Sequence, residues 1–261
     1  MESNTCKSCN NIFSGGFCPE CGQKVIGQRN TVKHLFTYLL NSFDIDRGVL
    51  FTAKSLFTAP GRVISEYLDG KTKVYYNPLK YLIVIASIYA VLMIWFNVFD
   101  TNLESMNEVL GTDENQTKLQ KEINAIMKKY LSFVSIIVLP FYSLVSSWVF
   151  RKRRLFYAEH LIMNAYFLSQ YLLILTGSVF VLLIFPSLAR FLLPFGMIVF
   201  ISYYTYAYRD YFRISFLKAF FSSILTSLGG LTLFYAFIAL TSIVIIIILK
   251  LLGYDIQEMV R

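Results

Sequence analysis

The chain has 261 residues, of which 56% are hydrophobic, 17% aromatic and only 15% charged. Soluble domains average about 45–50% apolar and about 25% charged residues, so this composition excludes a disordered chain, a coiled coil and a secreted disulfide scaffold. Charged residues become scarce after Lys80, and long uncharged runs follow. The composition predicts a multi-pass membrane protein with a small soluble part at its N-terminus.

All four cysteines fall within the first 21 residues, as the two C-x2-C pairs formed by Cys6, Cys9, Cys18 and Cys21. Four thiolates are the tetrahedral ligand set that zinc prefers, and the intervening Ser14-Gly15-Gly16 can turn the chain so that the pairs meet. We predict a structural Zn²⁺ ribbon over residues 1–28, because four protein ligands leave no open position and so short a segment cannot bury a core alone. Iron is the alternative metal.

The apolar pattern of residues 29–78 predicts short amphipathic helices between the cysteines and the first membrane span. Apolar residues at 32, 35, 36, 39, 40 and 43 follow the spacing of one helix face. A second helix is expected over about 49–58, and Pro60 begins a third that Gly70 ends. We expect these helices to lie on the cytoplasmic membrane surface or beneath the membrane bundle. A small soluble helical domain is the alternative.

Five uncharged apolar stretches predict a transmembrane bundle over residues 79–261, because a spanning helix needs about 20 apolar residues. Their approximate ranges are 81–99, 130–150, 161–185, 191–208 and 219–249. The last stretch would be about 46 Å long against a hydrocarbon core of about 30 Å, so it is either one long span or a hairpin broken at Gly229-Gly230. The predicted fold class is an all-α membrane protein that carries amphipathic helices and a zinc ribbon before its five spans.

The distribution of Lys and Arg predicts the orientation of the chain. With the N-terminus in the cytoplasm, seventeen of the 24 Lys and Arg residues lie on the cytoplasmic side. The N-terminal segment is polar and has no apolar signal region, so we expect the first span to be an uncleaved anchor. The C-terminus is then predicted to lie outside. Disulfides are not expected, because the cysteines fall in a reducing compartment.

A set of short motifs extends over the N-terminal third of the chain. They are Cys18-Pro19-Glu20-Cys21-Gly22-Gln23, Arg29, Asp46-Arg47-Gly48, Thr52, Pro60-Gly61, Tyr67-Leu68, Gly70-Lys71, Tyr76-Asn77-Pro78 and, later, Glu159-His160. This segment resembles a bacterial membrane family, the domain-of-unknown-function family numbered 3667, whose pattern pairs a C-x2-C-G knuckle with a downstream run of P-G, Y-L-x-G-K/R, Y and P. Lys71-Thr72-Lys73 departs from the common G-K-R form. The resemblance implies a bacterial inner-membrane protein and no particular activity.

Polar residues at the start of the third span form a candidate membrane site. His160 and Asn164 are four residues apart and share a helix face, and Glu159 precedes them. With Arg62 as a candidate partner, these residues could line a polar cavity, because polar groups at membrane depth are functional candidates. The alternative is that Glu159 and His160 lie at the membrane interface and pair with neighbouring arginines.

The last span carries a stripe of small residues, Ser222, Thr226 and Gly230, at intervals of four. Small residues allow helices to approach closely, so this stripe predicts helix packing within the chain or in a dimer rather than a ligand site.

No catalytic residue is assigned, because the H-E-x-x-H, G-x-S-x-G and phosphate-loop motifs are absent from the sequence. We expect a non-enzymatic adaptor or assembly factor, surrounded by membrane lipid, that binds a protein partner through the ribbon or forms a homo-oligomer. Nucleic acid is not an expected partner, since the ribbon has few basic residues. A transporter or lipid-handling protein that uses the polar site is the alternative. An enzyme acting on a lipid-linked substrate is a third hypothesis.

Overall fold

The computed structural model of the chain describes residues 4–5, 11–15, 18–20, 48–71, 74–101, 103, 124–126 and 128–251. The chain divides into two compact units, Met1–Asp46 and Arg47–Arg261. The predicted amphipathic helix around residues 32–43 lies outside the described residues.

The first unit contains a short antiparallel hairpin. Strand β1 (Asn4–Thr5) pairs with β2 (Ile12–Phe13), with Asn4 opposite Phe13. Phe13 and Cys18 are buried against each other beside this hairpin. Of the four predicted metal ligands only Cys18 is described, because Cys6, Cys9 and Cys21 lie outside the described residues.

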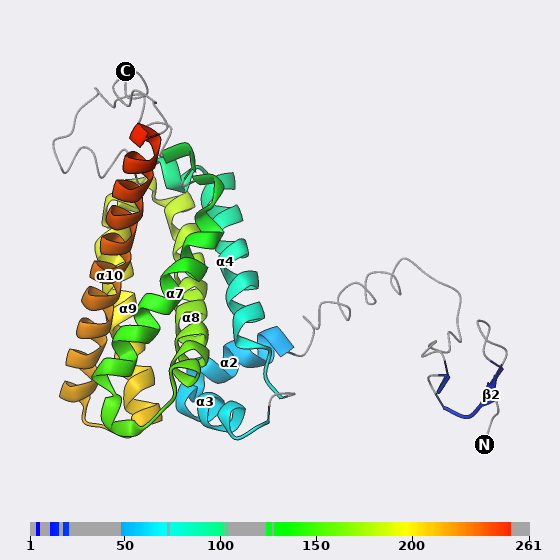
Figure 1. The fold of residues 1–261 in the computed structure, drawn as a ribbon. Coiled ribbons are helices and arrows are strands. Elements are labelled where there is room, and N and C mark those ends of the chain that lie inside the picture. The colour runs from blue at the N-terminus through cyan, green and yellow to red at the C-terminus, as the bar shows by residue number, and fades with distance from the viewer. Residues whose placement is uncertain are drawn as a thin grey trace. The chain divides into compact units, whose positions relative to one another are not determined.

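The second unit is a helical bundle. Within the described residues, five helices are long and apolar enough to cross a membrane. They are α4 (Pro78–Trp95), α7 (Leu131–Val149), α8 (Tyr157–Ile184), α9 (Leu192–Phe212) and α10 (Phe216–Leu251). Figure 1 shows these helices running side by side. The predicted multi-pass helical architecture is thereby confirmed.

Helix α8 is the centre of the bundle. It packs against α4, α7 and α9, whereas α10 packs against α7 and α9 at the periphery. Half of the most apolar stretch of α8 is buried inside the protein, against 11% for α10. Most of the α10 surface is therefore available to lipid.

The helices differ from the uncharged stretches at their ends. The first span begins at Pro78, where Asn77 caps the helix by accepting hydrogen bonds from the next backbone amides, and it ends at Trp95 rather than near residue 99. It ends there because Asn97 adopts a left-handed conformation with φ 54°, which stops an α-helix. The last stretch is a single helix that passes through Gly229-Gly230 without a break.

Two short helices cover one end of the bundle (Figure 1). Helices α2 (Leu50–Thr58) and α3 (Pro60–Leu68) pack against each other, against α8 and, for α3, against α9. Leu56, Val63 and Ile64 are fully buried in this contact. We call residues 48–77, which comprise α2, α3 and the connection to α4, the platform.

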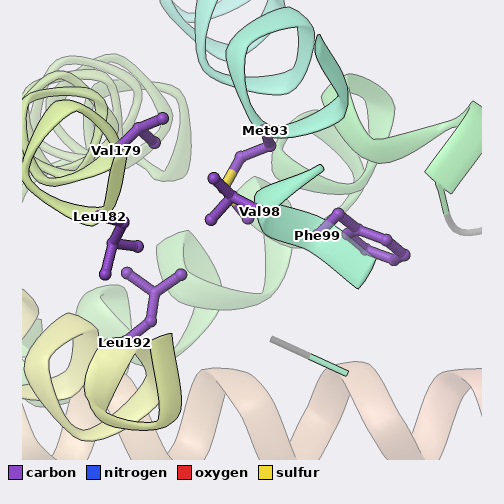
Figure 2. Packing of buried hydrophobic residues seen from close by; sticks show 6 residues of the cluster. All are labelled: Met93, Val98, Phe99, Val179, Leu182 and Leu192. Atoms are coloured by element: carbon purple, nitrogen blue, oxygen red, sulfur yellow. The ribbon is translucent and has the colours of Figure 1, made fainter. Parts of the chain in front are cut away.

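The opposite end of the bundle is closed by an apolar cluster. In Figure 2, Met93 and Val98 lie toward Leu182 of α8 and Leu192 of α9, whereas Phe99 is turned away from them. The 3-10 helix η3 (Pro186–Phe191) joins α8 to α9 at this end. Burial of such side chains gives about 1.5–3 kcal/mol each relative to exposure in water, an upper limit here because lipid also solvates apolar groups.

Candidate functional site

The C-terminal end of α2 is held by side chains from the membrane helices. The last four carbonyls of a helix have no partner within it and must find one elsewhere. Tyr203 donates its hydroxyl hydrogen to the Leu56 carbonyl at 3.1 Å, and Tyr206 donates to the Thr58 carbonyl at 2.8 Å. Both tyrosines lie on α9, so these bonds fix the end of α2 to the fourth span.

The N-terminus of α3 lies directly on the end of α9. The Gly61 amide donates a 2.7 Å hydrogen bond to Asp210 Oδ2, which satisfies one of the unpaired amides of the first helical turn. A Cβ atom at Gly61 would lie 2.7 Å from the Asp210 carbonyl carbon and 2.7 Å from the Tyr211 nitrogen. Only glycine allows the two backbones to come this close.

The connection from α3 to α4 is held to α8 in the same way. Tyr166 of α8 donates a 2.6 Å hydrogen bond to the Tyr76 carbonyl, and the Tyr76 amide donates to Thr52 Oγ1 at 2.8 Å. Gln170 of α8 bridges two elements, since its Nε2 donates to the Ala53 carbonyl at 3.3 Å and its Oε1 accepts from the Tyr81 hydroxyl at 3.0 Å. The platform is therefore hydrogen-bonded to the third and fourth spans at Ala53, Leu56, Thr58, Gly61 and Tyr76.

A small polar cluster stiffens the platform itself. Tyr75 donates a 2.6 Å hydrogen bond to Glu66 Oε2, and Lys71 lies 3.2 Å from Glu66 Oε1. The hydrogen bond from Tyr75 and, to a smaller extent, that from Lys71 hold the pKa of Glu66 below its usual value. Partial burial and the bond to Glu66 raise the pKa of Tyr75 to about 12.

Replacing Glu66 with glutamine is expected to lower the melting temperature at neutral pH, by an amount that shrinks as the pH falls. A carboxylate with a lowered pKa stabilises the fold above its unfolded pKa, and this contribution is lost as the pH falls through the folded pKa. Thermal melts from pH 7 to about pH 3 would measure the difference. Asp69→Asn, at an exposed carboxylate nearby, is the matched control. A Glu66→Gln effect that stays constant over this range would contradict the prediction.

A buried polar network joins the membrane helices near the same end. Ser146 of α7 lies at its centre: its Oγ accepts a 2.8 Å hydrogen bond from Asn164 Nδ2 and lies 3.0 Å from His160 Nδ1. The hydroxyl of Ser146 also lies 3.0 Å from the Ser143 carbonyl, to which it can donate, and the tautomer of His160 decides which atom donates between Ser146 and His160. Ser146, His160 and Asn164 are each no more than 1% exposed.

The network extends to the last two spans. Tyr208 of α9 donates a 3.2 Å hydrogen bond to Thr226 Oγ1 of α10, and its hydroxyl is also within hydrogen-bonding reach of Ser146. Within the described residues, Asn164 Oδ1 and the Tyr204 hydroxyl are buried without a hydrogen-bond partner. Other polar side chains of the spans bond to the backbone carbonyls of their own helices, as Ser143, Ser169 and Thr176 do.

The structure brings together only part of the predicted membrane site. His160 and Asn164 share one buried network, but Glu159 caps α8 by accepting a 2.7 Å hydrogen bond from the Phe156 amide. Arg62 is exposed on α3. Adjacent helix residues point about 100° apart, so Glu159 and His160 cannot face the same cavity.

The stripe of small residues on α10 faces the interior of the bundle. Thr226 bonds to Tyr208, Ser222 is buried, and a Cβ atom at Gly230 would lie 2.3 Å from the Tyr142 ring. These three residues pack against other helices of the same chain, which leaves them no role as a dimer surface.

Sequence reasoning missed the α9 residues that hold the platform. Tyr203, Tyr206 and Asp210 follow the i, i+3, i+7 spacing of one helix face, and this pattern was available as a signal. Ser146 was also missed, because a serine in an apolar helix usually bonds only to its own backbone.

Charged residues of the spans are confined to the ends of the helices, as far as the structure describes them. They are Lys80 of α4, Glu159 of α8, Arg209 and Asp210 of α9, and Lys218 and Lys250 of α10. The basic turn Arg151–Arg154 lies at the platform end, where Arg153 donates a 2.9 Å hydrogen bond to the Phe212 carbonyl. The platform end is therefore strongly basic.

Fold and composition together define a mostly helical, multi-pass protein of membrane type. Residues 46–90 match the sequence model of a family described as "Protein of unknown function (DUF3667)". The match covers the platform and most of α4, and it supports the predicted resemblance over this segment, whereas the four cysteines lie outside it. Comparisons with curated proteins and with solved structures yield no match.

Proposed function

We propose that the protein is a non-enzymatic adaptor of the bacterial inner membrane, in which a zinc-binding head (residues 1–28) recruits a protein partner and the helical bundle anchors the chain in the membrane. The observation that carries this proposal is the attachment of the platform. Side chains of α8 and α9 bind the carbonyls of Leu56, Thr58 and Tyr76, so the platform has one fixed position on the membrane helices.

The polar network supports an adaptor over a transporter. A transport path needs polar groups that line a water-filled cavity and ionisable groups at membrane depth. His160 and Asn164 are instead buried and bonded to Ser146, and the charged residues of the described spans lie at helix ends. The network therefore has a structural role, because it joins α7, α8, α9 and α10 through side-chain hydrogen bonds.

The basic platform end supports a cytoplasmic location for the head. Lys and Arg are retained on the cytoplasmic side of membrane proteins and attract anionic lipid headgroups. Arg151–Arg154, Arg213 and Lys218 share that end with the platform. The head, which precedes the platform in the chain, then lies in the cytoplasm under this proposal, and the C-terminal end of α10 lies on the outer side.

The chemistry of the head supports zinc. Four cysteines in two C-x2-C pairs provide a closed tetrahedral set of thiolates. Cys18, the described member, is buried against Phe13 beside the hairpin, in the low-dielectric surroundings of a structural site. Closure of all four positions by protein ligands suits a binding module rather than a catalyst.

The test is purification of the full chain in nanodiscs after in-cell crosslinking, with zinc, iron and crosslinked proteins quantified in one sample. Wild type should carry one zinc per chain and a stoichiometric partner. The Cys18→Ser/Cys21→Ser variant should lose both while its amount in the membrane stays unchanged. Glu20→Gln, an exposed change within the same knuckle, should keep both. An identical set of crosslinked proteins in all three samples would refute the adaptor proposal.

A further inference from the structure

A cavity opens at the end of the bundle opposite the platform. Its volume is about 370 Å³, and it lies between α8, η3 and α9, with Ser178, Leu182, Phe191 and Phe195 among its lining residues. Leu182 also belongs to the buried cluster of Figure 2, so the inner wall of the cavity is well packed. Ligand pockets begin at roughly 300 Å³, so this space can hold part of a small molecule.

The side chains that line the cavity are almost all apolar, which favours an apolar ligand. Ser178 provides the one hydroxyl among the lining side chains, and it already donates a 2.7 Å hydrogen bond to the Leu175 carbonyl of its own helix. A water molecule needs two to four polar partners, which these walls do not supply. Hydrocarbon fits the walls where water does not.

The depth of the cavity matches one leaflet of a bilayer. Its walls on α8 run from Ile174 to Leu182, and the helix ends at Ile184. Ile174 therefore lies ten residues before the helix end, which is about 15 Å of α-helix and half of the roughly 30 Å hydrocarbon core. An acyl chain that enters beside η3 would therefore fill the cavity from the surface of the membrane to about its midplane.

One cation lies at the mouth of the cavity. The Arg190 guanidinium lies 5.0 Å from the centre of the Phe191 ring, and Phe191 forms one wall. Arg190 is exposed, and neither of the two ion pairs among the described residues involves it. Arginine binds phosphate through paired, charge-assisted hydrogen bonds. An apolar slot beside an exposed guanidinium with no carboxylate partner in the described part of the chain is complementary to a lipid with an acyl chain below a phosphate.

We propose that this cavity binds one phospholipid, with an acyl chain between α8, η3 and α9 and its phosphate on Arg190. The site is separate from the adaptor function, because it lies at the opposite end of the bundle from the platform. Under the orientation proposed above, this site would hold the phospholipid in the outer leaflet of the membrane.

Native mass spectrometry of the full chain, released from nanodiscs of phosphatidylethanolamine and phosphatidylglycerol, tests this proposal. Wild type should retain one phospholipid under activation that strips the others. Ser178→Phe fills the cavity, and Arg190→Gln removes the phosphate contact. Each should lower the retained fraction by about tenfold, the effect expected from losing an apolar slot or a charge-assisted hydrogen bond.

Two matched variants control for bulk and for charge. Gly177→Phe adds the same ring one residue away, where a Cβ atom would meet nothing within 4 Å, and Arg151→Gln removes a cation from the platform end. Both should retain the lipid as wild type does. Full retention by Ser178→Phe, or a retained second copy of the chain in place of lipid, would overturn the proposal. Full retention by Arg190→Gln would overturn the phosphate assignment.

Discussion

Substitution of Gly61 by alanine is expected to lower the melting temperature of the purified protein by roughly 6 to 12 °C, which corresponds to about 3 kcal/mol. The added methyl group would meet the backbone of Asp210 and Tyr211 at 2.7 Å. Backbone in a packed helix end cannot move aside as a flexible side chain can. Helix α3 must therefore shift away from α9, and the Gly61 amide then loses its bond to Asp210.

Gly177→Ala is the matched control for this substitution. Gly177 also lies in a helix, but a Cβ atom there would meet nothing within 4 Å. Alanine should therefore raise helix stability slightly, by at most about 1 kcal/mol. Thermal unfolding in detergent, monitored by circular dichroism, measures both variants. If Gly61→Ala and Gly177→Ala melted at the same temperature, the close approach of α3 to α9 would be wrong.

Replacing Ser146 with alanine is expected to destabilise the bundle by about 2–3 kcal/mol, the cost of leaving buried polar groups without their partner. The substitution removes the hydroxyl that pairs with His160 Nδ1 and accepts from Asn164 Nδ2, which keeps only its bond to the His160 carbonyl. Both groups lie within the membrane helices, where water cannot replace the lost partner. Thermal unfolding in detergent, monitored by circular dichroism, measures the loss of stability. The crosslinked protein partner of the adaptor proposal is quantified in the same samples.

Ser147→Ala separates this effect from the general cost of removing a serine. The Ser147 hydroxyl bonds only to the Leu144 carbonyl of its own helix, so its loss should change stability by less than about 0.5 kcal/mol. Under the adaptor proposal, Ser146→Ala should lower stability and leave partner binding intact. A variant with unchanged stability but altered passage of a solute across liposome membranes would favour a transport role for the network.

The five spans could be predicted because lipid imposes a length and a composition on every helix that crosses it. The ends of these spans were harder to predict from the sequence. Residues 81–99 form an uncharged run, yet α4 stops at Trp95 because the backbone turns at Asn97. Likewise, charge alone could not decide whether Gly229-Gly230 breaks the last span. The packing of Gly230 against Tyr142 explains why a continuous helix carries glycines there.

The candidate site was only partly accessible from sequence. The spacing of His160 and Asn164 put them on one helix face, and the structure joins them through Ser146. The contact between Gly61 and Asp210 could not be foreseen, because helical periodicity describes neighbours within a helix and says nothing about partners 149 residues away. Long-range hydrogen bonds of this kind define the platform.

The attachment of the platform has a consequence for biosynthesis. Leu56, Thr58 and Gly61 are bonded to residues that follow them in the chain by 147 to 149 positions. At about 5–20 residues per second, ribosomes need roughly 7 to 30 seconds to add the missing partners. Helix α2 and the start of α3 are thus translated first, but their hydrogen bonds to α9 form only when the fourth span emerges. A nascent chain that stalls before α9 lacks these bonds, so its α2 and α3 stay accessible to chaperones and proteases throughout that interval.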